Sequence, residues 1–276
     1  MDETRGPDDN ESVEQPDSAS TADAHGDAAL IITYHDIAVG RSPLHVSSDL
    51  LRAHLDCLAE YSATPMTISD FARSLRESCW PHLPVCLTFD DGFTSVVDTA
   101  APLLLERSFP ATVFAVAGYL GKTNDWPSQP GWVERRRLAD TAQLAELARA
   151  GFEVGAHGLE HAPLGKATSE VVHRELVESK AALEDAMGVS IASFAYPYGS
   201  LPPRAEQAQV LRTYAAACTT IPDLVRADSN LAALPRVDAH YLRSTDSLRR
   251  LLEGSGRARL GARRAARRLR RIVHVD

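Results

Sequence analysis

Residues 85–92 read Val-Cys-Leu-Thr-Phe-Asp-Asp-Gly, and the rest of the chain can be arranged around this stretch. The short apolar run predicts a buried strand, and it ends abruptly in two adjacent carboxylates, Asp90 and Asp91, followed by Gly92. The carboxyl ends of strands are where α/β enzymes usually carry their chemistry. Two neighbouring carboxylates repel, so one of them tends to take up a proton unless a cation is present. The stretch therefore indicates either a metal-binding strand end or an ordinary polar turn, in which Asp-Gly is common.

Strand and helix patterns alternate on both sides of this stretch. Apolar strands are expected at 29–34, 85–89, 110–116, 152–156, 191–196, 215–219 and 234–237. Helices are expected at about 48–61, capped by Ser48 or Asp49, and at 67–77, 94–107, 140–150, 168–187, 203–213 and 244–253. This alternation predicts a parallel sheet covered by helices. A deformed (β/α) barrel of about seven parallel strands in one domain fits better than an open sheet, because polar candidate residues follow several different strands.

Charge is distributed unevenly over the 276 residues, whose formal net charge is −8. Residues 1–27 hold nine acids and one base with almost no large apolar side chains, which predicts a disordered acidic tail. Residues 257–276 form an Arg-rich C-terminal tail, with eight arginines between 257 and 271. We therefore expect one domain over 28–256 between two tails. The basic tail is open to three interpretations: a solvated end, a contact with an anionic surface or polyanion, or a contact with the acidic tail.

Several classes of protein are disfavoured by what the sequence lacks. No segment approaches the roughly 18 apolar residues of a membrane helix, and no basic region followed by an apolar stretch marks a secretory signal. These absences predict a cytoplasmic protein, and four cysteines without a CxxC pair agree with that compartment. Gly-x-Gly-x-x-Gly and Walker A loops are missing, so no nucleotide is expected. No nucleic-acid partner is expected either, since that role would rest on the arginine tail alone.

A second polar group follows the expected strand at 152–156. His157 and His161 are four residues apart, and a helical turn after the strand would bring both imidazoles to one side. Both follow a strand end, as Asp90 and Asp91 do, and such ends converge in a parallel barrel. One carboxylate and two histidines leave open positions for water, as in a catalytic metal site. The second carboxylate is then a candidate general base.

The two groups resemble the first two motifs of a known family. Thr-Phe-Asp-Asp-Gly at 88–92 and His157-x-x-x-His161 are similar to motifs of the polysaccharide deacetylases, the NodB-homology or family-4 carbohydrate esterases. Phe-Ala-Tyr-Pro-Tyr-Gly at 194–199 resembles the third motif of the branch that acts on poly-N-acetylglucosamine-type polymers. Residues 34–35, 118–121 and 234–236 also resemble that branch. The resemblance covers about residues 29–253, with the motifs in family order.

The resemblance implies a metal-dependent hydrolase that removes the N-acetyl group from an N-acetylated amino sugar by attack of a metal-bound water. The sugar would belong to a polysaccharide, an oligosaccharide or a glycoconjugate. By position, Asp91, His157 and His161 would be ligands of one divalent ion, with zinc expected and cobalt, nickel or manganese as alternatives. Asp90 would be the base, and the backbone amide of Tyr198 would help to hold the oxyanion.

Three positions depart from the family pattern. A Ser or Thr usually follows the first metal-binding histidine and braces the loop, whereas Gly158 stands here. The third motif often begins with an arginine that orients the base; Ala195 occupies that position, and Arg236 is the candidate substitute. The general acid is usually a histidine in a late Leu-x-His motif, for which His240 is the nearest match and His35 the rival.

The roles of two tryptophans and two alternative functions also remain open at this point. Trp126 and Trp132, in the long segment 118–137, could stack on a sugar ring or merely fix that loop. The missing secretory signal favours a related amide hydrolase, such as a deformylase or natural-product deacetylase, acting on a small or lipid-linked substrate. A non-catalytic sugar-binding module on the same barrel is disfavoured by the intact carboxylate and histidine pairs.

Overall fold

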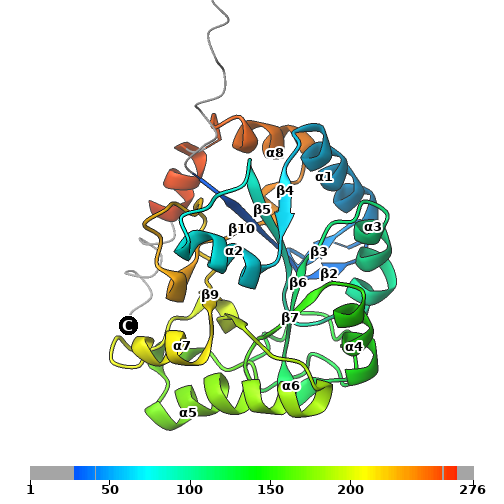
Figure 1. Cartoon of the computed structure of the whole chain (residues 1–276). Helices are drawn as coiled ribbons and strands as arrows, with labels where there is room; N and C mark the ends of the chain where they lie inside the picture. The colour runs from blue at the N-terminus through cyan, green and yellow to red at the C-terminus, as the bar shows by residue number, and fades with distance from the viewer. Residues whose placement is uncertain (1–27, 41, 257, 266–276) are drawn as a thin grey trace, which may run out of the picture.

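The apolar runs pair as parallel strands of one curled sheet in the computed structural model of the chain (Figure 1). The order along the sheet is β10 (Val237–Asp238), β1 (Leu30–Tyr34), β5 (Pro84–Phe89), β6 (Thr112–Ala115), β7 (Glu153–Ala156), β8 (Ser193–Ala195) and β9 (Ala216–Cys218). An eighth strand, β4 (Thr64–Met66), pairs with the first half of β5. The structure describes residues 28–40, 42–256 and 258–265, so the predicted acidic tail at 1–27 and the end of the Arg-rich tail lie outside the described residues.

The prediction of a deformed (β/α) barrel of about seven parallel strands is confirmed. The two edge strands, β9 and β10, approach each other at a seam, where Cys218 forms an isolated parallel bridge with Leu234. The Thr219 N–H donates to the carbonyl of Leu234 at 2.8 Å across this seam. Arg236 follows two residues later, so the nearly closed barrel carries its side chain into the interior.

Side chains alternate between the two faces of the sheet because the strand period is two residues. Leu30 and Ile32 of β1 belong to the apolar layer beneath the outer helices. Ile31, between them, belongs to a second apolar cluster with Cys86 of β5 and Phe114 of β6 inside the curl. This interior packing fills much of the barrel with apolar side chains.

Helices cover the outside of the curl (Figure 1). The α-helices of the described residues are α1 (Ser48–Glu60), α2 (Ile68–Arg76), α3 (Ala101–Leu105), α4 (Thr141–Arg149), α5 (Ser169–His173), α6 (Ser179–Met187), α7 (Gln207–Thr213) and α8 (Thr245–Leu252). α2 instead lies across the opening of the curl, where Phe71 and Ala72 join the interior cluster. No helix among the described residues is both long and apolar enough to span a membrane.

Helix ends follow the expected chemistry with one correction. α1 is capped by Ser47, whose hydroxyl accepts from Leu50 N at 3.2 Å, and not by Ser48 or Asp49. Ser47 has the extended backbone that a cap requires, whereas the next two residues are already helical. The expected helix at 168–187 is present, with a π turn at Arg174–Glu178 between α5 and α6. It ends at Gly188 in the left-handed conformation that glycine tolerates.

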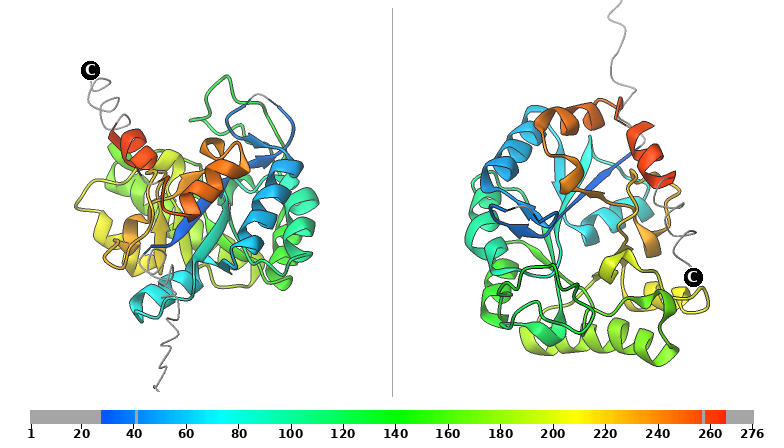
Figure 2. Two further views of the ribbon diagram at one scale, coloured as in Figure 1. Left: turned by 90° about the horizontal axis from the view of Figure 1, so that it is seen from above. Right: turned by 180° about the vertical axis from the view of Figure 1, so that it is seen from behind.

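A small second sheet was not anticipated. Strands β2 (Asp36–Ile37) and β3 (His45–Val46) have two residues each, which is too short for any periodic signal. Arg136 Nε lies 3.1 Å from Asp36 Oδ2 and ties this sheet to the segment 118–137. Figure 2 shows the blue two-stranded sheet and the green segment at one end of the barrel, opposite α2. That end carries the polar residues that follow the strands.

Candidate active site

Three buried side chains from two strand ends meet with their polar atoms nearly equidistant. His157 Nε2 lies 3.4 Å and His161 Nε2 3.3 Å from Asp91 Oδ1, and the two Nε2 atoms are 3.2 Å apart. A tetrahedral ion with ligand bonds of about 2.0–2.1 Å needs donors separated by about 3.3–3.4 Å. The three predicted ligands therefore come together, and their spacing fits a divalent ion.

The route to this convergence differs from the expected one. Residues 157–161 form a loop, so the two histidines meet without the helical turn that was considered as a route. His161 has φ of 57° and Asp91 has φ of 71°. Side chains other than glycine rarely adopt this left-handed backbone, which costs on the order of 1–3 kcal/mol unless the surroundings enforce it. Tyr198, with φ of 57°, shares this feature, so strained backbone gathers at the site.

Hydrogen bonds and charges set the protonation of the three residues. The carbonyl of Ala195 accepts from His157 Nδ1 at 2.8 Å, so Nε2 is the atom that faces Asp91 and His161 and carries the lone pair when the ring is neutral. Burial lowers the pKa of His161 to about 4. Burial opposes ionisation of Asp91, but the two histidines hold the pKa of its carboxyl below the usual range. A neutral imidazole and an ionised carboxylate are the forms that divalent ions bind.

Arg236 forms a bidentate ion pair with Asp90 through its two terminal nitrogens. Nη1 donates to Oδ1 and Nη2 to Oδ2, each at 2.7 Å. The remaining donors are also used, Nε by the carbonyl of Thr219 at 2.9 Å and Nη1 by Thr88 Oγ1 at 3.1 Å. Burial alone would raise the pKa of Asp90, but the charges of Arg236 and His157 hold it below its usual value. Asp90 is therefore an oriented, ionised carboxylate, 4.0 Å from His157 Nε2.

The two candidate acids lie in different places. His35 Nε2 is 4.0 Å from Asp90 Oδ2, and His35 lines the cleft above the three ligands. His240 is exposed, its Nδ1 bonded to Arg243 Nη2 at 2.7 Å, and it is not among the described residues that line the cleft. The structure thus brings His35 to the site and leaves His240 outside.

The cleft has a volume of about 150 Å³, and the two tryptophans contribute to it differently. Trp126 is only 2% exposed; its ring lies 4.2 Å from that of His161, and its Nε1 donates to the Tyr198 hydroxyl at 3.2 Å. Trp132 is 66% exposed and lines the cleft. Trp126 therefore packs against His161 and fixes the segment 118–137 there, whereas Trp132 remains accessible to a bound molecule.

Comparison with known sequences points in one direction. Residues 79–217 match the family model described as polysaccharide deacetylase. YxkH of Bacillus subtilis (strain 168), which its name places provisionally among the polysaccharide deacetylases, is 26% identical over 208 residues, covering 75% of this chain and 70% of YxkH. Poly-beta-1,6-N-acetyl-D-glucosamine N-deacetylase of Staphylococcus aureus (strain MSSA476) is 24% identical over 163 residues, or 56% of this chain. That match spans 53% of the Staphylococcus protein.

Solved structures share the fold. The Streptococcus pyogenes deacetylase PplD, in complex with acetate, superposes with a TM-score of 0.66 and 23% identity over 76% of this chain and 92% of PplD. IcaB from Ammonifex degensii has the same TM-score and 23% identity, covering 84% of this chain and 98% of IcaB. These proteins therefore have the same curled barrel.

Proposed function

The chain belongs to the polysaccharide deacetylase family, and on that premise we propose that it removes the N-acetyl group from an N-acetylated amino sugar with the help of one divalent ion, most simply zinc. The observation that carries the proposal is the pairing of two groups. Asp91, His157 and His161 form a preorganised set of ligands, and Asp90 stands beside them as an ionised carboxylate held by Arg236.

The reaction divides into roles for individual residues. A divalent ion held by Asp91, His157 and His161 would supply a Lewis acid for the amide carbonyl and lower the pKa of water. Asp90 takes the proton from the water that attacks the carbonyl carbon. Arg236 keeps Asp90 ionised and oriented, so it acts as a positioning residue.

The second half of the reaction breaks the C–N bond. The Tyr198 backbone N–H stabilises the oxyanion that forms when water adds to the carbonyl. His35 donates a proton to the leaving nitrogen, which yields acetate and the free amine. We assign this role to His35 and not to His240, because His35 lines the cleft beside Asp90.

The cleft and one relative support an amino sugar as substrate. A cavity of about 150 Å³ is small, and Trp132 offers it an exposed aromatic face of the kind that packs against a sugar ring. The Staphylococcus relative is named for acting on poly-β-1,6-N-acetylglucosamine. We propose N-acetylhexosamine units as the substrate class, with small or lipid-linked amides as the alternative.

The test is acetate release from a panel of N-acetylhexosamine monomers, conjugates and oligomers. The protein is stripped with a chelator, restored with single metals, and compared with Asp90→Asn, which should retain the ion but lose on the order of 10²–10⁴ in rate. Asp98→Asn is the matched control, because Asp98 is exposed and away from the cleft.

Three outcomes would change the proposal. Near wild-type rates for Asp90→Asn would refute the assigned base, and release that survives removal of the metal would refute the ion. Release of formate, or of acetate from lipid-linked or other small amides only, would support the alternative substrate class.

A further inference from the structure

Glu175 is a buried carboxylate that faces the backbone of the metal-binding loop, residues 157–162. It lies on the π turn between α5 and α6. Its Oε2 accepts from Leu159 N at 3.0 Å and from Ala162 N at 3.3 Å, and its Oε1 accepts from Glu160 N at 3.1 Å. One side chain thus satisfies three backbone donors of a loop that has no strand partner on that side.

The opposite edge of the loop is held by backbone. Ala117 N and Gly118 N, just after β6, donate to the carbonyls of Gly158 and Leu159, each at 2.9 Å. The loop is therefore bonded on both edges. Removing the carboxylate would release one edge of the loop and leave its half-buried N–H groups without their protein acceptor.

Gly158 fits this arrangement because a side chain there would collide with Glu175. A Cβ built on Gly158 would lie 2.3 Å from Glu175 Oε2, and φ at Gly158 is +84°. The carboxylate occupies the space that a Ser or Thr at this position would need. The position of this carboxylate is consistent with the departure at Gly158 from the Ser or Thr of the family pattern.

We propose that Glu175 is a positioning residue that braces the metal-binding loop in place of that hydroxyl. It sets the separation of His157 from His161 through the loop backbone and touches neither the ion nor the substrate. The inference rests on the proposed metal site.

The first test is titration of the metal-free protein with Zn²⁺ by calorimetry. Glu175→Gln replaces one acceptor oxygen with an amide that faces N–H donors, and we expect Zn²⁺ affinity to fall on the order of 10-fold or more, as for other residues that support metal ligands. Glu178→Gln, an exposed change on the same π turn, should leave affinity unchanged. Unchanged Zn²⁺ affinity in folded Glu175→Gln would overturn the proposal.

A double-mutant cycle supplies the second test. Gly158→Ala should weaken Zn²⁺ binding in the wild-type background, where its Cβ meets the carboxylate. In a Glu175→Ala background, Gly158→Ala should reduce Zn²⁺ affinity much less. The backbone strain of an alanine at position 158 is the same in both backgrounds, but the collision of its Cβ with the carboxylate is absent. Equal costs in both backgrounds would overturn the proposal; if Glu175→Ala does not fold, the Gln comparison decides. Wild-type protein that binds Zn²⁺ without releasing acetate would contradict the proposed function and leave this inference intact.

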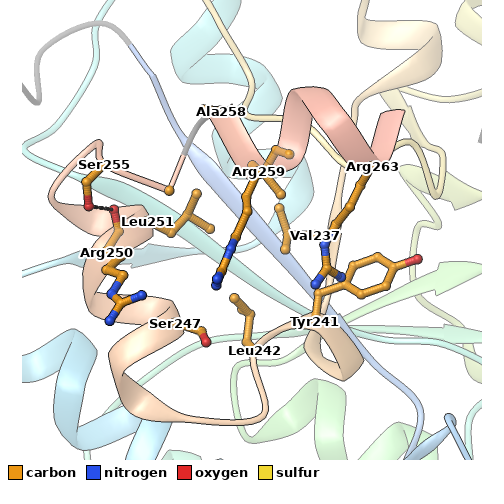
Figure 3. A pocket seen from close by; sticks show the side chains of 12 residues that line it. Val237, Tyr241, Leu242, Ser247, Arg250, Leu251, Ser255, Ala258, Arg259 and Arg263 are labelled. Carbon is orange, nitrogen blue, oxygen red and sulfur yellow. Dashed lines mark hydrogen bonds between the residues drawn. The ribbon is translucent and has the colours of Figure 1, made fainter. Parts of the chain in front are cut away.

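A second inference concerns a cavity of about 210 Å³ away from the cleft, between α8, β10 and the helical residues 258–265 (Figure 3). Val237, Leu242 and Leu260, all buried, give it an apolar floor. Arg259 and Arg263 extend into it from the helical residues. Arg263 also stacks on Tyr241, with its Cζ 4.1 Å from the ring centroid.

The arginines that line this cavity lack the carboxylate partners that nearby arginines have among the described residues. Arg264 pairs with Asp223, and Arg249 Nη2 lies 2.9 Å from Glu60 Oε2. Arg250, Arg259 and Arg263 have no carboxylate partner within the part of the chain that the structure describes, and none of the described lining residues is acidic. Like charges gathered without counter-charge repel, which an anion would relieve.

We infer that this cavity, which we call the arginine pocket, binds a phosphate group attached to an apolar moiety. Guanidinium groups suit phosphate because they donate in a planar, bidentate fashion. The apolar floor suits the organic part of such a ligand. A phospholipid headgroup and a soluble phosphate ester share this chemistry.

The test compares binding of inorganic phosphate, of an alkyl phosphate, and of phosphatidylglycerol against phosphatidylcholine vesicles. Arg259→Gln with Arg263→Gln should weaken binding at least 10-fold. The control, Arg249→Gln with Arg264→Gln, removes the same charge outside the pocket and should have little effect. Binding of alkyl phosphate alone identifies a soluble ester, and binding of anionic vesicles identifies a headgroup. Equal loss in both double variants, or binding of no probe, would overturn the inference.

Discussion

The two halves of the candidate site are built in different ways. Asp90 follows β5, and its partner Arg236 enters from the barrel seam, so both are held by the sheet and fully buried. His157 and His161 lie on a loop whose shape depends on left-handed backbone and on hydrogen bonds from neighbouring segments. The barrel itself therefore positions the proposed base, whereas the two histidines proposed as metal ligands depend on contacts outside the sheet.

This difference predicts where damage should appear. A change in the strand half should reduce the free energy of unfolding, because it disturbs a buried ion pair in the barrel. A change in the loop half should reduce metal affinity more than stability.

Arg236→Met should have the largest effect on stability. It leaves the Asp90 carboxylate buried without its cation, and breaking a buried pair in this way costs about 3–5 kcal/mol. Urea unfolding of the metal-free protein at neutral pH measures the loss. Adding Asp90→Asn to Arg236→Met should recover much of it, since the unpaired charge is then gone. A loss below about 1 kcal/mol would show that the sheet does not depend on this pair.

The two tryptophans should separate support of the loop from contact with substrate. Trp126→Ala removes a buried ring from the face of His161 and should cost about 3 kcal/mol of stability, together with metal affinity. Trp132→Ala removes an exposed ring and should change stability by no more than about 0.5 kcal/mol. Trp132→Ala should instead raise KM, because Trp132 lines the cleft. Equal loss of stability in the two variants would contradict this assignment.

His157→Ala should abolish the stabilisation that a bound ion confers. At a free ion concentration of about 100 times Kd, that stabilisation is about 2.7 kcal/mol. Thermal unfolding with and without Zn²⁺ should show a shift for the wild type and none for the variant. A persistent Zn²⁺-dependent shift in His157→Ala would place the ion elsewhere.

Glu153 offers a buried carboxylate that pairs with no cation among the described residues, for comparison with Asp90. Burial raises the pKa of Glu153, although Ser69 N and Thr112 Oγ1 donate to its Oε2 at 3.0 and 2.9 Å. Because the folded state holds its proton to higher pH than the unfolded state, stability is lost as pH rises from about 4.5 through the folded pKa. Glu153→Gln should lack this loss, so its stability relative to wild type should improve between pH 4 and 7 in urea unfolding. A difference that stays constant with pH would contradict this prediction.

Much of the site could be predicted from sequence because its residues follow strand ends. Asp90, Asp91, His157 and His161 were recognised by residue type and spacing, and parallel strands bring their ends together. The backbone between the histidines could not be predicted, since a spacing of four residues does not distinguish a helical turn from a loop with left-handed residues. No sequence pattern near Glu175 indicates its role. The one related feature is Gly158, which is distant in sequence and meets Glu175 only in the folded structure.

The alternation of strands and helices, the family, and the identity of the chemical groups follow from the sequence alone, because these depend on local periodicity and residue type. The tertiary structure decided which distant groups meet. Arg236 reaches Asp90 across 146 positions of chain, and His35 reaches the cleft while His240 remains outside. Such pairings depend on how the sheet curls and where its seam falls, which is a property of the packed barrel and of no single segment.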